Sequence, residues 1–402
     1  MPWDICNLVK RRSEFVKLAL QIQQGEGFGN FAQLCDRYGI SRKTGYKWVK
    51  RYRSDGTNGL EDRSRRPRNS PRKTPDAVEE RVTAVRKKHP SWGGRKIRNR
   101  LEMNRCVDIP AASSISHILR RNGLMEEKPR GESHRIVRFE RDRPNQLWQM
   151  DFKGHFGLSG GGRCHPLTAL DDHSRFNLIL AACRDEKGAT VKRHLQEAFR
   201  RYGLPDQILC DNGASWSCPG HRQALGRLEA WLVRVGVEVI HGRPYHPQTQ
   251  GKEERFHKTL DVDLLRTRPS WASHEECDAA FGPFRQLYNE ERPHDALGGR
   301  PPIERYRISE RSYDETSEKR HAEEHYLEGD TLRKVSKSGE ISFRSNRVYV
   351  GVGITGETVA LRAYDEGIWK VSYAWKELGV VAMTDEKHEL LRLEKLPRNP
   401  AE

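Results

Sequence analysis

Apolar residues recur at helical spacing in three stretches near the start of the chain. They lie at Phe15, Leu18, Ala19 and Ile22, then at Phe31, Leu34, Cys35 and Tyr38, and then at Gly45, Trp48, Val49 and Tyr52. Residues spaced in this way share one face of a helix. Between the second and third stretches, Gly39 suits a helix end, Ile40 a core contact and Ser41 a helix start. This pattern predicts a helix-turn-helix module over residues 1–62.

A second set of apolar positions at helical spacing follows a linker at residues 54–75. The linker is rich in Gly, Pro, Ser and Arg, so we expect it either to be a solvated tether or to lie along DNA phosphates. Beyond it, apolar residues mark three short helices at Val78, Val82 and Val85, at Ile97 and Leu101, and at Ile115, Ile118 and Leu119. A second helical, helix-turn-helix-like module is therefore predicted over residues 76–125.

From residue 145 onward the hydrophobic period changes from that of helices to that of strands. The segment LWQMDFKGHF alternates, with Met150 on one face and Asp151 on the other. Two strands around an Asp-Asp-His-Ser turn come next. Short apolar strands then alternate with amphipathic helices, and a long helix covers residues 249–266. The predicted order β-β-β-α-β-α-β-α describes a mixed α/β domain over residues 140–306.

Short alternating strands return near the end of the chain. They are separated by Gly-containing turns over residues 330–385, which predicts a small β-barrel followed by a polar tail that frays. The expected fold class is therefore multidomain α/β, with N-terminal helix-turn-helix modules before the α/β domain and a C-terminal small β-barrel after it.

The excess positive charge is confined to the first third of the chain. The formal net charge is +16; residues 1–140 hold 32 Lys and Arg against 16 Asp and Glu, whereas residues 141–402 hold 40 of each. This asymmetry favours binding of a polyanion, although a basic surface can also serve solubility alone. On the third helix the basic side chains opposite the apolar stripe are Arg42, Lys43, Lys47, Lys50 and Arg51. Such a helix is expected to enter a DNA major groove; a plain three-helix bundle is the alternative.

Other features of the composition exclude several classes of protein. No apolar stretch approaches the roughly 18 residues that a membrane span needs, and the first residues lack the apolar region of a secretory signal. The eight Cys are scattered and form no C-x-x-C pair, which argues against a zinc finger. Scattered thiols suit a reducing compartment, so a cytoplasmic, nucleoid-associated protein is expected.

Three carboxylates occupy positions where a sheet exposes side chains. Asp151 lies mid-strand on a polar face, Asp211 stands where an apolar strand ends, and Glu254 falls early in the long helix. Clustered carboxylates repel one another, and a divalent cation relieves that repulsion. Mg²⁺ favours few carboxylates with waters and substrate phosphates, and two ions can hold the attacking and leaving oxygens of a phosphoryl transfer. We therefore hypothesise a site for two Mg²⁺ ions, with Mn²⁺ as a possible substitute.

Helix geometry distinguishes Glu254 from the neighbouring glutamate. Phe256 and Leu260 belong to the apolar stripe of the long helix, and at about 100° per residue Glu253 falls within that stripe. Glu254 falls roughly opposite, and Lys258 shares its face one turn later. This geometry predicts Glu254 as the metal ligand and Lys258 as a DNA contact. A merely solvated helix face is the alternative.

The motifs of the α/β domain resemble those of a known family. LWQMDFKG, LDDHSR, LCDNG, RPYHPQTQGKEERFHKTL and YNEERPHDAL occur in that order. Over residues 145–306 the chain is similar to the DDE transposases of bacterial insertion sequences, within the retroviral-integrase superfamily. The resemblance implies an RNase H-like catalytic core, and Asp151, Asp211 and Glu254 match the metal-binding triad. Two departures stand out: the spacing of 42 residues between Asp211 and Glu254 is longer than usual, and Glu253 replaces a position that is often apolar.

The same resemblance gives expectations for other motif residues. The YNEERPH run, which begins at Tyr288, is expected to pack beneath the site, and His246 and Pro247 to shape the loop before the long helix. Asp172 and Arg175 are expected to form a turn and an internal ion pair, with support of the carboxylates as the alternative. Asn212 and Gly213 would set the turn that presents Asp211; Gly tolerates a positive φ there.

The resemblance also implies a function. A transposase would bind the terminal inverted repeats of its element, cut a DNA strand with the help of Mg²⁺, and join the resulting 3′-OH to target DNA. Two ends must be held together, so at least a dimer on double-stranded DNA is expected, with no membrane partner. The C-terminal barrel would bind DNA or a neighbouring subunit. Two alternatives stay open: an RNase H-like nuclease or resolvase that cuts without joining, and a non-catalytic DNA-binding regulator.

Overall fold

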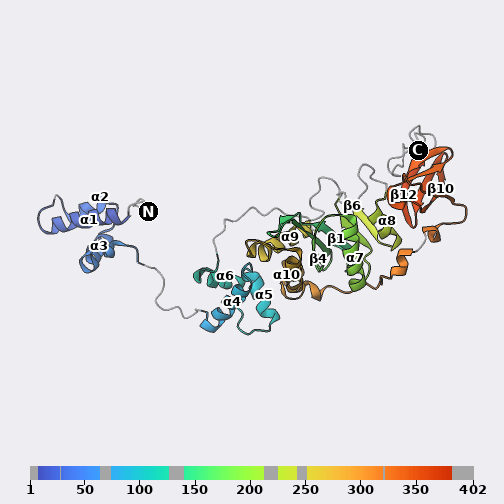
Figure 1. Cartoon of the computed structure of the whole chain (residues 1–402). Helices are drawn as coiled ribbons and strands as arrows, with labels where there is room; N and C mark the ends of the chain where they lie inside the picture. The colour runs from blue at the N-terminus through green and yellow to red at the C-terminus, as the bar shows by residue number, and fades with distance from the viewer. Residues whose placement is uncertain are drawn as a thin grey trace. The chain divides into compact units, whose positions relative to one another are not determined.

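The computed structural model describes residues 8–27, 29–63, 74–125, 140–211, 225–241, 251–319 and 322–382 (Figure 1). The chain divides into two compact units, Met1–Lys73 and Thr74–Glu402. The predicted frayed tail after residue 385 lies outside the described residues. No helix among the described residues is both long enough and apolar enough to cross a membrane.

The first unit is the helix-turn-helix that the apolar spacing predicts. It contains α1 (Leu8–Gln23), α2 (Phe31–Arg37), α3 (Arg42–Asp55) and the short helix η2 (Gly56–Leu60). Gly39 follows α2 with φ +63, and the Ser41 hydroxyl accepts a hydrogen bond from the Thr44 N–H and so caps α3. Gly45 lets the helices approach closely, because a Cβ atom there would meet Cys35 Sγ at 2.8 Å and Phe15 Cζ at 2.9 Å.

The second unit begins with three more helices, α4 (Asp76–Lys88), α5 (Gly94–Met103) and α6 (Ala112–Arg121). Their shared core comprises Val82, Trp92, Ile97, Leu101, Ile115, Ile118 and Leu119. Leu287, from far along the chain, packs against this core, and Arg100 Nη2 lies 2.7 Å from Glu291 Oε2. The second helical module is therefore docked on the α/β domain.

The α/β domain is built on a mixed six-stranded sheet. Its strands are β1 (Leu147–Phe152), β2 (Phe156–Gly157), β3 (Arg163–Asp171), β4 (Asn177–Cys183), β5 (Gln207–Cys210) and β6 (Glu238–His241). The path through the sheet is β2-β3-β1-β5-β6, and β4 pairs with β3. The pairs β1–β3 and β3–β4 are antiparallel, whereas β1–β5 and β5–β6 are parallel. The predicted antiparallel meander that leads into parallel strands is confirmed.

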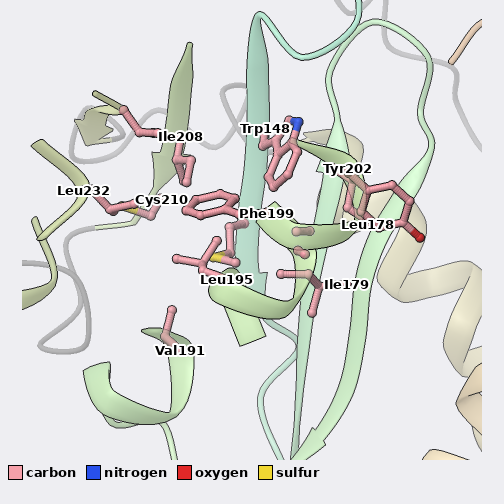
Figure 2. Close-up of a cluster of buried hydrophobic side chains, with 14 of the residues drawn as sticks. Trp148, Leu178, Ile179, Val191, Leu195, Phe199, Tyr202, Ile208, Cys210 and Leu232 are labelled. Atoms are coloured by element: carbon pink, nitrogen blue, oxygen red, sulfur yellow. The ribbon is translucent and has the colours of Figure 1, made fainter. Parts of the chain in front are cut away.

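Helices cover both faces of this sheet. On one face, α7 (Gly188–Tyr202) and α8 (Arg227–Arg234) bury a core around Trp148, Phe199 and Trp231. Figure 2 shows Trp148, Phe199 and Ile208 meeting in this core, and the Trp148 and Phe199 ring centroids lie 5.6 Å apart. On the other face, α9 (Gly251–Asp263) and α10 (His274–Gln286) pack a second core.

Short helices connect the remaining elements. They are η4 (Leu265–Thr267), the π-helix η5 (Leu287–Glu291), η6 (Asp295–Leu297), η7 (Pro302–Glu304), η8 (Glu315–Lys319), η9 (Ala322–His325) and η10 (Val352–Ile354). Tyr306, just after η7, is buried in the core of the sheet and stacks on Phe176 at 4.2 Å. This segment therefore belongs to the α/β domain.

The C-terminal strands form two sheets, where a small β-barrel was expected. The strands are β7 (Thr331–Lys334), β8 (Glu340–Phe343), β9 (Asn346–Tyr349), β10 (Thr358–Asp365), β11 (Ile368–Tyr373) and β12 (Lys376–Ala382). A four-stranded sheet has the order β12-β11-β10-β7, and β8 pairs only with β9 among the described residues. Leu225, Ala230 and Val233 from the region of α8 complete their common core. The described strands therefore form no closed barrel, and α8 shares their core.

Candidate active site

The fold brings Asp151 and Asp211 to neighbouring positions. Asp151 lies on β1 and Asp211 directly follows β5, and these two strands are parallel neighbours in the sheet. The register pairs Leu147 with Gln207 and Gln149 with Leu209. Continuing this register pairs Asp151 with Asp211, and adjacent strands lie about 4.8 Å apart. Two carboxylates are therefore side by side at the same edge of the sheet.

Crowding of negative charge is visible at Asp151. Burial raises the pKa of Asp151 to about 7, and the charges of Asp211, Glu186 and Glu254 add to this rise, while a hydrogen bond from the Phe152 backbone opposes it. The ionised form of Asp151 is thus disfavoured by its burial and by the neighbouring carboxylates, two of which are the other members of the predicted triad. Carboxylate oxygens are ligands that Mg²⁺ takes, so the chemistry of these residues fits that ion.

The third carboxylate of the predicted triad lies at the start of α9. Glu254 is exposed in the first turn of α9, and its charge acts on Asp151. Among the described residues, no group of three or more His, Cys, Asp or Glu side chains is close enough to hold a metal ion. Residues 212–224 and 242–250, which adjoin Asp211 and α9, lie outside the described part of the chain. The predicted roles of Asn212, Gly213, His246 and Pro247 fall in these segments.

Glu253 occupies the opposite face of α9, as the helix geometry predicted. Its side chain is fully buried, and its Oε2 lies 2.9 Å from the Thr168 hydroxyl. That hydroxyl also lies 3.0 Å from the backbone oxygen of Asp151. Burial raises the pKa of Glu253 well above the usual glutamate value, and the charge of Asp151 adds to it. Glu253 thus ties the inner face of α9 to the strands of the sheet.

Asp172 and Arg175 both form ion pairs, but with partners that the sequence did not indicate. Asp172 is fully buried; its carboxylate accepts hydrogen bonds from Gln149 Nε2 at 2.6 Å and from Lys252 Nζ. Lys252 lies two residues before Glu254, so the turn after β3 holds the start of α9. Arg175 pairs instead with Glu140 at 2.8 Å. The separation of Asp172 from Lys252 in the sequence explains why no local pattern could reveal this pair.

The YNEERPH run packs against α9, as predicted. The Tyr288 ring is buried and meets Phe256 edge-on at 4.8 Å. Asn289 exchanges two hydrogen bonds with the backbone of Asn177 on β4, at 2.8 and 2.9 Å. Arg292 Nη1 pairs with Asp263 Oδ2 at 2.5 Å. These contacts hold the YNEERPH run against β4 and against α9, the helix that carries Glu254.

Sequence reasoning missed one pair of residues near Asp211. The imidazole of His241, the last residue of β6, contacts the Glu229 carboxylate and the backbone oxygen of Asp211. Burial favours the neutral ring, yet the hydrogen bonds to Glu229 and to Asp211 prevail and raise the pKa of His241 above its usual value. In the sequence, nothing distinguishes Glu229 from other polar residues of a helix. Its contact with His241 becomes apparent only once β5 and β6 are paired in the structure.

The predicted DNA-contacting residues of the first unit do not have equal environments. Arg42, Lys43, Lys47 and Lys50 are exposed on α3. Arg51 is half-buried: its Nη2 donates to the backbone oxygen of Glu61 at 2.9 Å, and its guanidinium lies 4.9 Å from the centre of the Trp48 ring. Arg51 therefore has a role in packing α3. In the second unit, Lys258 is exposed on α9.

Comparisons with known proteins find similarity both in the N-terminal helical modules and in the α/β domain. The integrase core domain model matches residues 141–247, and a second integrase core domain model matches residues 235–302. A helix-turn-helix domain model matches residues 12–68, and a homeodomain-like domain model matches residues 44–119. Proteins of two bacterial insertion elements are also similar to the chain. Over residues 141–302 the chain is similar to integrase core domains, and over residues 12–119 it is similar to helix-turn-helix and homeodomain-like domains.

The chain spans about two thirds or less of the length of these two insertion-element proteins. It is 26% identical over 251 residues to the uncharacterized 39.2 kDa protein of insertion element IS476 from Xanthomonas euvesicatoria, covering 59% of this chain and 67% of that protein. It is 28% identical over 162 residues to the uncharacterized 31.7 kDa protein of IS407 from Burkholderia multivorans, covering 40% of this chain and 55% of that protein.

Solved integrase cores are similar to the chain over a smaller segment. The HTLV-2 integrase catalytic core domain in complex with magnesium covers 41% of this chain, with 16% sequence identity and a TM-score of 0.32; the match spans 99% of that core. The catalytic core domain of BIV integrase covers 40% of this chain, with 24% identity and a TM-score of 0.31, and the match spans 92% of that core.

Proposed function

We propose that this protein is an insertion-sequence transposase that binds the terminal inverted repeats of its element and catalyses metal-dependent DNA cleavage and strand transfer. The observation that carries the proposal is the parallel register of β1 and β5, which, continued by two residues, sets Asp151 opposite Asp211 within the matched integrase core. The raised pKa of Asp151 supports it, because Asp211 and Glu254 add to the rise that burial causes.

Asp151, Asp211 and Glu254 are the proposed metal ligands. Two Mg²⁺ ions, or Mn²⁺ in their place, would supply stabilisation of the attacking and leaving oxygens of an in-line displacement at phosphorus. The protein's own residues position α9, the helix that carries Glu254. Thr168 and Glu253 hold the inner face of α9, Asp172 and Lys252 hold its start, and the opposite face is left exposed to DNA.

The basic residues would bring DNA to these carboxylates. Arg42, Lys43, Lys47 and Lys50 form an exposed row on α3 of the first unit, which suits phosphate contacts and groove binding. Lys258 on α9 would meet a phosphate near the reacting strand. Because two element ends must be joined to one target, at least two copies of the chain are proposed to assemble on double-stranded DNA.

Strand joining is the experiment that tests the proposal. The full chain with Mg²⁺ should cut a duplex that carries the element's terminal repeat, and should insert pre-cut ends into a plasmid. Cutting without joining would favour a nuclease or resolvase. Specific binding with neither reaction would favour a non-catalytic regulator.

Binding specificity is measured separately, with terminal and scrambled duplexes over a range of salt concentrations. Affinity for the terminal repeat should fall steeply with salt, since phosphate contacts release counterions. Lys47→Ala should lower this affinity and reduce the salt slope by about 1 if the residue contacts one phosphate. Equal affinity for scrambled and terminal duplexes would reduce the N-terminal unit to an electrostatic tether.

A further inference from the structure

The imidazole of His241 lies between two oxygen atoms at the edge of the sheet. Its Nδ1 is 3.1 Å from the backbone oxygen of Asp211, and its Nε2 is 2.7 Å from Glu229 Oε1. The sheet register explains the first contact, because β6 is the parallel neighbour of β5 and pairs His241 with Cys210. His241 therefore stands directly beside the residue that precedes Asp211.

The two contacts use both nitrogens of the ring. A backbone carbonyl oxygen can only accept a hydrogen bond, so Nδ1 is the donor toward Asp211. The Glu229 carboxylate contacts the other nitrogen, Nε2, and so fixes the orientation of the ring. His241 is therefore anchored on Glu229 and directed at the backbone of Asp211.

Glu229 is itself firmly held. Its side chain is only 6% exposed, and its second oxygen, Oε2, accepts the Gly226 N–H at 3.0 Å at the start of α8. Both carboxylate oxygens thus have donors, and the helix is fixed by Trp231 and Leu232 in the core of the sheet. A buried carboxylate with this support is a rigid anchor for the His241 ring.

The backbone of Asp211 is where such support is required. The paired residues of β5 and β6 end at Cys210 and His241, so Asp211 lies one residue past the last pair of the ladder. Its carboxylate must nevertheless keep a fixed direction if it is to bind a cation. The His241 side chain continues the support beyond the end of the ladder by donating to the Asp211 carbonyl.

We infer that Glu229 and His241 form a positioning pair that fixes the backbone of Asp211 for metal binding. The inference rests on the proposed function, since it takes the Asp211 carboxylate as a metal ligand. Neither residue of the pair binds metal or DNA in this assignment. Residues that orient metal ligands in this indirect way typically account for roughly 10- to 100-fold in metal affinity or activity.

The test is a metal titration of the full chain without DNA, by calorimetry with Mn²⁺, alongside cleavage rates and terminal-repeat affinity. His241→Phe keeps a ring of similar size and removes both ring nitrogens, so the Mn²⁺ dissociation constant should rise by roughly 10- to 100-fold with unchanged DNA affinity. His241→Gln can still donate to the Asp211 carbonyl and should recover part of the loss. Glu229→Gln keeps the shape of the anchor and should weaken Mn²⁺ binding in the same direction.

A matched control uses the second ion pair of α8, in which Arg234 Nη1 lies 2.9 Å from Glu357 Oε1. Glu357→Gln should leave the Mn²⁺ dissociation constant unchanged, which separates positioning from a general loosening of the helix. If His241→Phe fails to fold, the Gln variants at both positions decide the matter through the same titration. Unchanged Mn²⁺ affinity in the folded variants of His241 and Glu229 would overturn the positioning pair. If instead Asp211→Asn binds Mn²⁺ as tightly as the unaltered chain, the proposed metal site itself fails.

Discussion

The two faces of α9 carry neighbouring glutamates in opposite environments. Glu253 is fully buried against Thr168, whereas Glu254 is exposed on the side that also bears Lys258. The inner face holds α9 against the sheet, and the outer face leaves Glu254 exposed to solvent. The difference teaches that chemical identity alone says little about the surroundings of a carboxylate, and that the position around the helix axis decides which glutamate is buried and which faces solvent.

The largest effect is expected when charge is removed from Glu254 on the outer face, or from Asp151 or Asp211, the other two proposed metal ligands. Asp151→Asn, Asp211→Asn and Glu254→Gln should each lower cutting and joining by orders of magnitude, because bound metal ions supply several kcal/mol of transition-state stabilisation. Binding of the terminal repeat should survive, since it depends on the separate N-terminal unit. Gel assays of cleavage, joining and binding measure all three.

The control for these variants is Glu197→Gln, which removes a carboxylate from an exposed position on α7. It should keep full activity. Full activity of Asp151→Asn or Asp211→Asn would contradict the proposed mechanism itself.

A second prediction concerns the anchor that holds the start of α9. Asp172→Asn keeps the size of the side chain but leaves Lys252 without its buried counter-charge. Breaking a buried pair in this way should cost roughly 3 kcal/mol of unfolding free energy. Urea unfolding followed by circular dichroism measures the loss. Glu140→Gln, which affects the partly exposed pair with Arg175, should cost clearly less, and an equal cost would mean that the Lys252 pair has no special importance.

A third prediction concerns DNA on the outer face. Lys258→Ala should raise the KM for the terminal-repeat duplex while leaving kcat nearly unchanged, because a phosphate contact contributes to binding more than to the reaction. The salt dependence of the affinity should fall by about 1 in slope. Steady-state cleavage at several salt concentrations gives both quantities. A fall in kcat alone would instead place Lys258 among the residues that act on the reaction.

The smallest effect is expected on the inner face. Glu253→Gln keeps the size of the side chain and an oxygen that can accept from Thr168, so stability should change by less than about 1 kcal/mol. Cleavage should be nearly normal. A dead Glu253→Gln variant beside an active Glu254→Gln variant would reverse the assignment of the two faces.

Local periodicity explains which parts of the structure the sequence could predict. Apolar spacing and the Gly39 turn define the first helical module, and the same period separates Glu253 from Glu254. The pairing of Asp151 with Asp211 depends on which strands become neighbours, which the family resemblance implied and alternation could not show. The contacts of Asp172 with Lys252 and of Glu229 with His241 join separate elements and left no local signal.

The expected C-terminal barrel is not confirmed, for a related reason. Alternating residues predict strands, but they do not say whether the first and last strands meet. In the structure the common core of β7 to β12 is completed by Leu225, Ala230 and Val233 from the region of α8. This contact joins segments about 100 residues apart in the sequence, so the alternation of the strands could not indicate it.

α8 has a thermodynamic consequence for the whole second unit. Leu228, Trp231 and Leu232 of α8 belong to the core of the six-stranded sheet, whereas Ala230 and Val233 belong to the core of the C-terminal sheets. Melting of either core would remove one side of the packing of α8, so the two cores should unfold in a single cooperative transition. The core of the first helical module is built from residues of the first unit, so this module should give a transition of its own in calorimetry.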